Sequence, residues 1–270
     1  MPTPAEALDF SSQTLDKLID PVSGCPWDKE QTPLTLSEYI IEECFEMVDA
    51  IRKNEPSHVC DEMGDLLFLL CHVAKRYGDH FSFADALTAG AQKMRRRHPH
   101  VFGDEKLSTR EELNASWESI KKQEKASAGE SKHTFSALPA GLPSLTKAYR
   151  INSKAATDGF TWENDEEVDR QVEAEWLEFL DAKENNDAAA MEHELGDMLF
   201  VLTEAGRRMG IKSSPALDAA CNRFLRRYEF MECRADEAGK SFKELTLDEK
   251  DELWEQSKQD PACLMHLRND

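Results

Sequence analysis

The chain has 270 residues, with 33 Lys and Arg against 53 Asp and Glu, and therefore a net charge of −20. This acidity argues against a general nucleic-acid-binding surface, because phosphate backbones are bound mainly through Lys and Arg. No stretch approaches the ~18 consecutive apolar residues of a membrane-spanning helix, and the first ten residues, MPTPAEALDF, carry no secretion signal. We therefore expect a soluble, cytoplasmic protein whose partners include neither nucleic acid nor membranes.

The first half of the chain shows helical periodicity. Apolar residues recur at steps of three and four over residues 36–51, which predicts a helix that ends before Asn54-Glu-Pro56. A second helix is expected over about 57–77. Its central residues 66–71 (LLFLLC) are apolar on every side, so we expect them to be buried. A third helical stretch covers 84–97.

The second half repeats this plan, with helices expected around 166–182 and 189–209 and a break near Asn185-Asn186. The motif Glu62-Met-Gly-Asp-Leu-Leu-Phe68 recurs 132 residues later as Glu194-Leu-Gly-Asp-Met-Leu-Phe200. Such self-similarity indicates two copies of one structural unit. Three further pairs keep their order: Gly24-Cys-Pro-Trp27 with Gly159-Phe-Thr-Trp162, Arg96-Arg97 with Arg226-Arg227, and Trp117-Glu-Ser-Ile-Lys121 with Trp254-Glu-Gln-Ser-Lys258.

The residues between the two copies have the composition of a solvated connection, rich in Lys, Ser, Ala, Gly and Pro. We predict an N-terminal domain over 1–125, a linker over 126–144 and a C-terminal domain over 145–270. The fold class is predicted to be all-α, with a small helical bundle in each domain. The apolar helix at 66–77 and its copy need more cover than a two-helix hairpin offers, so we expect dimerisation to complete the bundles.

Each copy carries four acidic residues separated by steps of 3, 16 and 3. Residues three apart share one face of a helix, and a hairpin of two helices would bring the two pairs face to face. Unpaired carboxylates beside an apolar stretch are costly to desolvate, and a hard cation such as Mg²⁺ relieves that cost. We therefore predict metal sites at Glu43, Glu46, Glu62 and Asp65, and at Glu175, Glu178, Glu194 and Asp197.

The alternative interpretation is a solvated acidic face, since about a fifth of the chain is acidic. The metal site is favoured because Gly, Asp, Leu and Phe coincide in the same register. Iron is disfavoured, since di-iron bundles use Glu-x-x-His and both copies lack that His. Gly64 and Gly196 lie inside the helices despite a cost of ~1 kcal/mol relative to Ala, which predicts the close approach of another helix.

A group of cations ends the helical stretch 84–97. A charge run is usually a solvated face, but beside a metal–carboxylate pocket we favour the binding of substrate phosphates. Trp117 and Trp254 each lie one turn from a lysine, so a base could stack while the lysine meets phosphate; the alternative is a core Trp beside a surface Lys. The cations are Lys93, Arg95, Arg96, Arg97 and His98, matched by Arg223, Arg226 and Arg227.

Other familiar sites have no motif in this sequence. Neither glycine-rich phosphate-binding loop, G-x-x-x-x-G-K-[S/T] or G-x-G-x-x-G, is present, and no nucleophile–histidine motif stands out. The seven cysteines include no Cys-x-x-Cys, which argues against a disulfide framework and a structural zinc site. His193 precedes Glu194 and is interpreted as a surface residue in preference to a neighbour of the site.

Four motifs occur together: Gly24-Cys-Pro-Trp-Asp-Lys-Glu-Gln-Thr32, Glu42-Glu43-x-x-Glu46, Glu62-x-x-Asp65, and Arg96-Arg-His-Pro-His-Val-Phe102. In combination they resemble MazG, the family of tandem-domain nucleoside triphosphate pyrophosphohydrolases, over nearly the whole chain. The resemblance implies an all-α fold, dependence on Mg²⁺ with Mn²⁺ as a substitute, and homodimers whose chains assemble helical bundles together. It also implies cleavage of NTP to NMP and pyrophosphate.

By motif matching, the resemblance makes the eight carboxylates Mg²⁺ ligands. The sequence departs from the pattern where the first Glu of E-E-x-x-E is Glu42 in the first copy but Ala174 in the second. Relatives in this family can be active in the second domain, so the departure leaves open which copy is catalytic. The nucleotide-contacting residues would be Arg223, Arg227, Trp254 and Lys258, with first-domain equivalents Lys93, Arg97, Trp117 and Lys121.

The favoured hypothesis is Mg²⁺-assisted hydrolysis of NTP and dNTP at the α-phosphorus, with broad specificity and a role in nucleotide-pool control. Lys and Arg would hold the β and γ phosphates, and Glu42 would orient or deprotonate the water. One alternative is a narrower pyrophosphatase, similar to dimeric dUTPase or phosphoribosyl-ATP hydrolase. The other is a non-catalytic regulatory scaffold that binds nucleotide.

Overall fold

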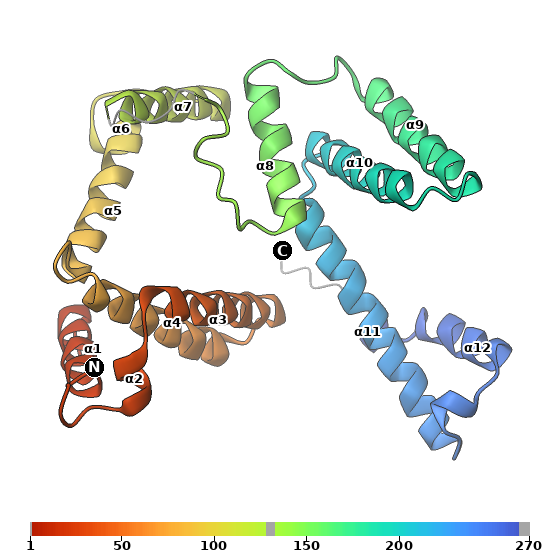
Figure 1. Ribbon diagram of the computed structural model, residues 1–270, viewed down its shortest axis with the longest axis horizontal. Helices are drawn as coiled ribbons and strands as arrows, with labels where there is room; N and C mark the ends of the chain where they lie inside the picture. The colour runs from red at the N-terminus through yellow and green to blue at the C-terminus, as the bar shows by residue number, and fades with distance from the viewer. Residues whose placement is uncertain (1, 128–132, 265–270) are drawn as a thin grey trace. The chain divides into compact units, whose positions relative to one another are not determined.

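The computed structural model describes residues 2–127 and 133–264. The chain divides into two compact units, Met1–Gly129 and Glu130–Arg268, whose boundary falls inside the predicted linker, part of which lies outside the described residues. All regular structure in the described ranges is helical (Figure 1), so the predicted all-α class is confirmed. None of the described helices combines the length and the apolar character needed to cross a bilayer.

The first unit is built around a helical hairpin. Helices α3 and α4 pack against each other, α1 packs on α4, and α5 continues from α4 to meet α7. The predicted helices over 36–51, 57–77 and 84–97 are confirmed as parts of α3, α4 and α5. The elements are α1 (Pro4–Leu18), α2 (Pro26–Glu30), α3 (Pro33–Lys53), α4 (Pro56–Arg76), α5 (Phe83–Arg97), α6 (Pro99–Phe102) and α7 (Arg110–Ser127).

The second unit contains the equivalent hairpin. Helices α9 and α10 pack together, α8 lies against α10 and α11, and α11 carries α12 and α13. The predicted helices around 166–182 and 189–209 are confirmed as α9 and α10. The elements are α8 (Ser144–Thr157), α9 (Asp165–Glu184), α10 (Ala188–Arg208), α11 (Ser213–Glu237), the 3₁₀ turn η1 (Phe242–Glu244), α12 (Leu247–Ser257) and α13 (Pro261–Leu264).

Side-chain caps fix where several helices begin. Thr32 and Ser82 close capping boxes at the starts of α3 and α5, and Thr246 does the same for α12. In the second hairpin, Asn164 accepts a backbone hydrogen bond at the start of α9, and Asp187 accepts two at the start of α10. Each contact satisfies N–H groups that the first turn of a helix leaves unpaired.

Both hairpins turn through an asparagine at equivalent positions. Asn54 follows α3 with φ of 56°, and Asn186 precedes α10 with φ of 53°. This left-handed backbone is disfavoured for most L-residues, and Asn tolerates it better than most. The turn is only a few residues long, so it fixes which turn of α3 faces which turn of α4, and likewise in the second hairpin.

Each unit has a small core of its own. Leu15 and Leu36 are almost completely buried in the first unit. In the second, Val168, Val201 and Met231 are buried. Leu36 and Val168 occupy equivalent positions of the repeat, so the same face of α3 and α9 enters the core. Burial of such side chains stabilises a fold by about 1.5–3 kcal/mol each.

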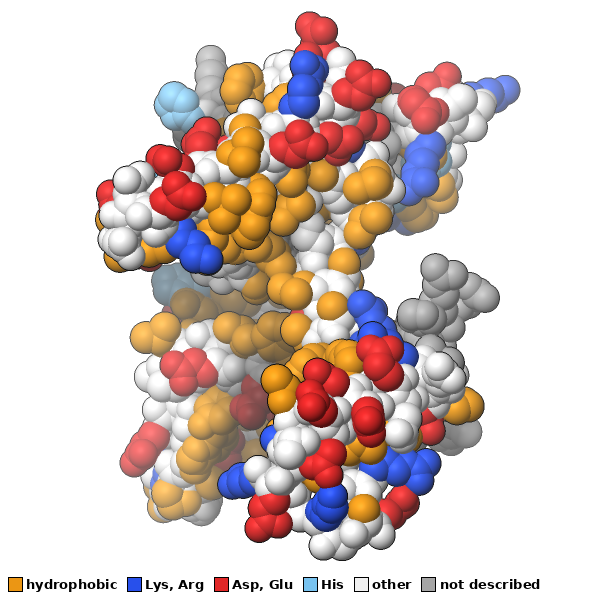
Figure 2. Space-filling model, turned by 90° about the vertical axis from the view of Figure 1, so that its right-hand side faces the viewer, with side chains coloured by type: hydrophobic (Ala, Val, Ile, Leu, Met, Phe, Trp, Pro, Cys, Tyr) orange, Lys and Arg blue, Asp and Glu red, His pale blue; other side chains and the backbone are white. Residues whose placement is uncertain are grey.

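The expectation that residues 66–71 are buried is wrong for most of the stretch. Only Cys71 is buried, and Leu67 and Leu70 are exposed by 43% and 38%. The reason is that a hairpin covers only one side of α4. Figure 2 shows hydrophobic side chains gathered in surface patches. Exposed residues at equivalent repeat positions are Phe45 and Leu177, Met63 and Leu195, Leu67 and Leu199, and Leu70 and Leu202.

The expected close approach at the helix glycines is also wrong within this chain. A Cβ built on Gly64 or Gly196 meets no described atom within 4 Å. The two glycines face open space, so packing by another helix of the same chain does not explain them.

Candidate metal and nucleotide site

The first hairpin brings three of its four predicted ligands together. Ligand oxygens of Glu43 on α3 and of Glu62 and Asp65 on α4 all lie within 4.8 Å of one another. Glu43 and Glu62 are half-buried and Asp65 is exposed. The hairpin turn at Asn54 aligns these positions, since it sets the turn of α3 that stands beside the start of α4.

The second hairpin repeats the cluster. Ligand oxygens of Glu175, Glu194 and Asp197 also lie within 4.8 Å of one another. Glu175 is buried, and its carboxylate accepts a hydrogen bond of 2.8 Å from the side-chain amide of Gln171 one turn earlier on α9. The 132-residue repeat therefore reproduces the geometry of the cluster as well as its sequence.

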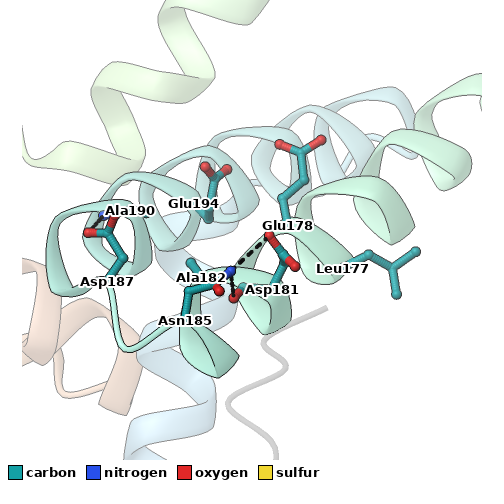
Figure 3. A pocket seen from close by; sticks show the side chains of 8 residues that line it. All are labelled: Leu177, Glu178, Asp181, Ala182, Asn185, Asp187, Ala190 and Glu194. Carbon is teal, nitrogen blue, oxygen red and sulfur yellow. Dashed lines mark hydrogen bonds between the residues drawn. The ribbon is translucent and has the colours of Figure 1, made fainter.

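The fourth predicted ligand of each set stands apart from these clusters. Glu46 and Glu62 line a cavity of about 400 Å³ beside the first cluster. Glu178 and Glu194 line one of about 620 Å³ beside the second. In Figure 3 the Glu178 and Glu194 side chains extend from facing helices, so Glu178 borders the space next to the three gathered carboxylates.

Hydrogen bonds within the turn between α9 and α10 hold one end of the second cavity. The side-chain amide of Asn185 donates to the backbone carbonyl of Asp181 at 2.9 Å and to its carboxylate at 3.3 Å. Asp187 accepts from the backbone N–H of Ala190 at 3.1 Å. Figure 3 shows both contacts at the turn between α9 and α10. The break predicted at Asn185-Asn186 thus forms one end of the cavity.

The carboxylates of each cluster repel one another. The pKa of Glu43 is raised, first by the loss of water around it and then by the charges of Asp65 and Glu46. The pKa of Glu194 is raised by the same loss of water, followed by the charge of Glu178. Crowded anions of this kind favour protonation or a bound cation. A set of hard carboxylate oxygens fits Mg²⁺ and similar cations.

Sequence reasoning missed Gln171 as a neighbour of the second cluster and gave that role to His193 only as the less favoured interpretation. Gln171 contacts Glu175, and Nε2 of His193 lies 3.3 Å from a carboxylate oxygen of Asp197. Both pairs are four residues apart on a helix, a spacing that places side chains side by side. His193 is 72% exposed, so it is a surface residue as predicted and also a neighbour of the cluster. Glu42 is exposed on α3 next to Glu43.

The predicted cations and aromatics also assemble, in pairs. The Arg97 guanidinium lies 5.9 Å from the ring centre of Trp117, and that of Arg227 lies 5.3 Å from the ring centre of Trp254. Each lysine pairs with a glutamate three residues earlier: Lys121 with Glu118 at 2.6 Å, and Lys258 with Glu255 at 2.5 Å. Lys93 is exposed and Arg223 is half-buried on the same helices as the arginines.

Both tryptophans also pack against other aromatic rings. Trp117 makes an edge contact with the His98 ring at 4.9 Å, and Trp254 lies 5.3 Å from Phe224. These contacts support packing of the tryptophans, and stacking of a base on them stays a prediction. Of the described residues, those that line the two carboxylate cavities belong to α3 and α4 or to α9 and α10 and the turns between them, and none is from the cationic set.

Comparisons with known proteins identify a family and several relatives named as pyrophosphohydrolases. Residues 31–102 match the model of the MazG nucleotide pyrophosphohydrolase domain. The chain is 35% identical over 248 residues to a nucleoside triphosphate pyrophosphohydrolase of Escherichia coli strain K12, covering 90% of this chain and 94% of that protein. It is 34% identical over 247 residues to the Thermotoga maritima nucleoside triphosphate pyrophosphohydrolase/pyrophosphatase MazG, covering 90% of this chain and 92% of the relative.

Proposed function

The chain belongs to the MazG family, and from this premise we propose that it hydrolyses nucleoside triphosphates to nucleoside monophosphate and pyrophosphate. The observation that carries the proposal is the carboxylate cluster that recurs in both hairpins, with Glu43, Glu62 and Asp65 in the first. A triphosphate carries several negative charges, so carboxylates alone would repel it. The cluster makes chemical sense as the anchor of a divalent cation.

The proposed ligands of Mg²⁺, or of Mn²⁺ in its place, are the three gathered carboxylates of each hairpin, with Glu46 and Glu178 at the adjoining cavities. A divalent metal bound there supplies Lewis-acid chemistry, polarising phosphoryl oxygens and lowering the pKa of water. The raised pKa of Glu43 supports this assignment, because loss of water and then the charges of Asp65 and Glu46 destabilise its carboxylate anion, which a bound cation would stabilise.

The remaining proposed roles fall to the chain's own cations and aromatics. Arg97 and Arg227 have the planar donor geometry that suits phosphate oxygens. Lys93, Lys121, Arg223 and Lys258 would add charge, and Trp117 and Trp254 would contact the base. Glu42 is proposed to orient or deprotonate the attacking water, with the pyrophosphate leaving group held by the cations.

We further propose that two chains associate. The exposed apolar side chains on the two hairpins occur at equivalent repeat positions, for example Phe45 and Leu177 at 63% each. Large exposed apolar surfaces mark interaction sites, and repetition in both units indicates that they serve the same purpose in each. Within one hairpin, no residue of the cationic set lines the carboxylate cavity. A second copy could supply such cations from its own helices.

Product analysis tests the proposed reaction. An NTP and dNTP panel is incubated with the full chain and Mg²⁺, and the products are separated by anion exchange. The expected products are NMP and pyrophosphate from several bases, in agreement with broad specificity. Release of NDP and phosphate would overturn the proposal. Turnover of a single nucleotide would instead identify a narrow pyrophosphatase, and binding without turnover a regulatory scaffold.

A further inference from the structure

Two arginines at the end of α5 are held by one carboxylate from α7. Nε and Nη2 of Arg97 donate to Oε2 of Glu124 at 2.9 and 2.6 Å, and Nε of Arg96 lies 3.4 Å from Oε1. The Arg97 and Glu124 side chains are only 19% and 24% exposed. A forked, shielded contact of this kind is stronger than an ordinary surface ion pair. Glu124 therefore occupies Nε and Nη2 of Arg97, donors that a phosphate could otherwise use.

The electrostatics agree with this geometry. The pKa of Glu124 is lowered, chiefly by its hydrogen bond from Arg97 and further by Arg96, with loss of water acting against the shift. The carboxylate is therefore ionised at neutral pH and competes as an anion. A phosphate oxygen that approaches Arg97 has to displace it.

The second unit has the same arginine and tryptophan, and within the described ranges Arg227 makes no ion pair. Arg227 lies over Trp254 as Arg97 lies over Trp117. In the register that pairs Lys121 with Lys258, position 124 corresponds to the uncharged Pro261, and the neighbouring carboxylate Asp260 lies one residue earlier. Within the described ranges, Nε of Arg227 is buried and has no hydrogen-bond partner. A buried donor without a partner is costly, and an anion's oxygens would satisfy it.

We propose that Glu124 acts as an internal competitor for polyphosphate in the first unit, so that the two units are unequal phosphate-binding sites and Arg227 binds the anion more tightly than Arg97. The proposal rests on the proposed role of these arginines in holding the triphosphate. Glu124 lies on α7, outside both the carboxylate hairpin and the cationic helix α5, and would determine the affinity of the first unit for polyphosphate.

Calorimetric titration with inorganic tripolyphosphate and Mg²⁺ tests this in the full chain. The Arg227→Ala substitution is made first, to remove the proposed phosphate ligand of the second unit. The titration then measures tripolyphosphate binding to the first unit. In that background Glu124→Gln is compared with Glu111→Gln, an exposed residue of the same helix that changes the net charge equally. We expect Glu124→Gln to bind about tenfold more tightly than its control, a difference of about 1.4 kcal/mol. Equal affinities would overturn the proposal.

A reciprocal variant in the second unit tests the same proposal even if the variants of the first unit misfold. In an Arg97→Ala background, Pro261→Glu introduces a carboxylate at the exposed equivalent position of the second unit. We expect tripolyphosphate binding to weaken about tenfold, and unchanged binding would count against Glu124. If Arg97→Ala with Arg227→Ala leaves binding intact, the arginines are not phosphate ligands and the inference fails. The NMP and pyrophosphate analysis is independent of all three results, so the proposed reaction is judged separately.

Discussion

His72 is a buried histidine that the proposed chemistry does not use. Its side chain is 1% exposed on α4, and its Nε2 has no hydrogen-bond partner among the described residues. Its pKa is lowered, first by burial and then by the nearby charge of Arg76, while Asp28 acts in the opposite direction. The folded protein therefore holds His72 neutral at pH values where the unfolded chain begins to protonate it.

This lowered pKa predicts a pH dependence of stability. Below the unfolded-state pKa of about 6.5 the unfolded chain binds a proton that the folded chain does not, so the free energy of unfolding falls as pH decreases toward the lowered folded pKa. The slope for one proton is at most about 1.4 kcal/mol per pH unit. We expect His72→Gln to flatten the curve of urea midpoint against pH between 7.5 and 5.5.

The control for this experiment is His80→Gln, which changes an exposed histidine of the same unit. It should leave the pH dependence close to that of the unchanged chain. A His72→Gln curve with the original slope would show that His72 does not set the pH dependence.

Among the elements, the hairpin turns control the geometry of both carboxylate clusters. Asn54 and Asn186 adopt the left-handed backbone that costs most L-residues roughly 1–2 kcal/mol. We expect Asn54→Ala to lower the free energy of unfolding by about 1 kcal/mol, while Asn54→Gly keeps it within a few tenths, because glycine takes this conformation freely. Thermal unfolding of the two variants measures the difference, and equal losses would contradict the argument.

The two hairpins are not equal as proposed metal sites. The second cluster includes the buried Glu175, whereas no member of the first is buried. Electrostatic interactions are stronger where water is excluded. We expect Asp197→Ala to lower kcat/KM about 10²-fold or more, and Asp65→Ala to lower it less.

The measurement is steady-state pyrophosphate release at saturating Mg²⁺, with Asp79→Ala, an exposed residue beyond α4, as the control. The reverse order would place catalysis in the first unit, where Glu42 is present and its counterpart is Ala174. Full activity in the double variant Asp65→Ala, Asp197→Ala would refute the metal-site proposal for both hairpins.

The helices and hairpins were predictable from sequence because their signals are local. The period of apolar residues and the breaks at Asn54 and Asn185 each lie within one or two turns of the structure they specify. The repeat of the Gly-Asp motif then extends the same prediction to the second half. The carboxylate clusters followed, since two helices joined by a short turn leave few registers. Side-chain rotamers decide that oxygens of Glu43, Glu62 and Asp65 lie together while Glu46 lines the adjoining cavity. The spacing of residues in the sequence does not determine these rotamers.

Longer-range features could not be predicted in this way. The pairing of Arg97 with Glu124 joins residues 27 apart on different helices, and no periodic signal connects them. The apolar composition around Leu67 predicts a core position, but composition does not show which other helices pack against the stretch, and Leu67 is exposed. The open space beside Gly64 is a similar case, because the penalty of a helix glycine does not reveal what packs against it.

At the scale of the whole molecule, the exposed apolar side chains predict association. A single chain has a mass of 30.7 kDa. Light scattering should give twice that mass, and Phe45→Glu together with Leu177→Glu should shift it to the single-chain value, since charges at both equivalent positions oppose burial. A single-chain mass for the unchanged protein, with pyrophosphate release intact, would refute the dimer.

In the proposed dimer, the repeated apolar positions give each chain two association surfaces, so the chain would be bivalent. Once one pair of units has joined, the second pair meets at an effective concentration set by the connecting segment, in the millimolar range for short flexible connections. Loss of one surface then weakens dimerisation by about 10²–10⁴-fold, because the gain from linking the two surfaces is lost. A substitution confined to Phe45 should therefore shift the concentration at which dimers dissociate by several orders of magnitude, while the Leu177 surface still specifies the same pairing.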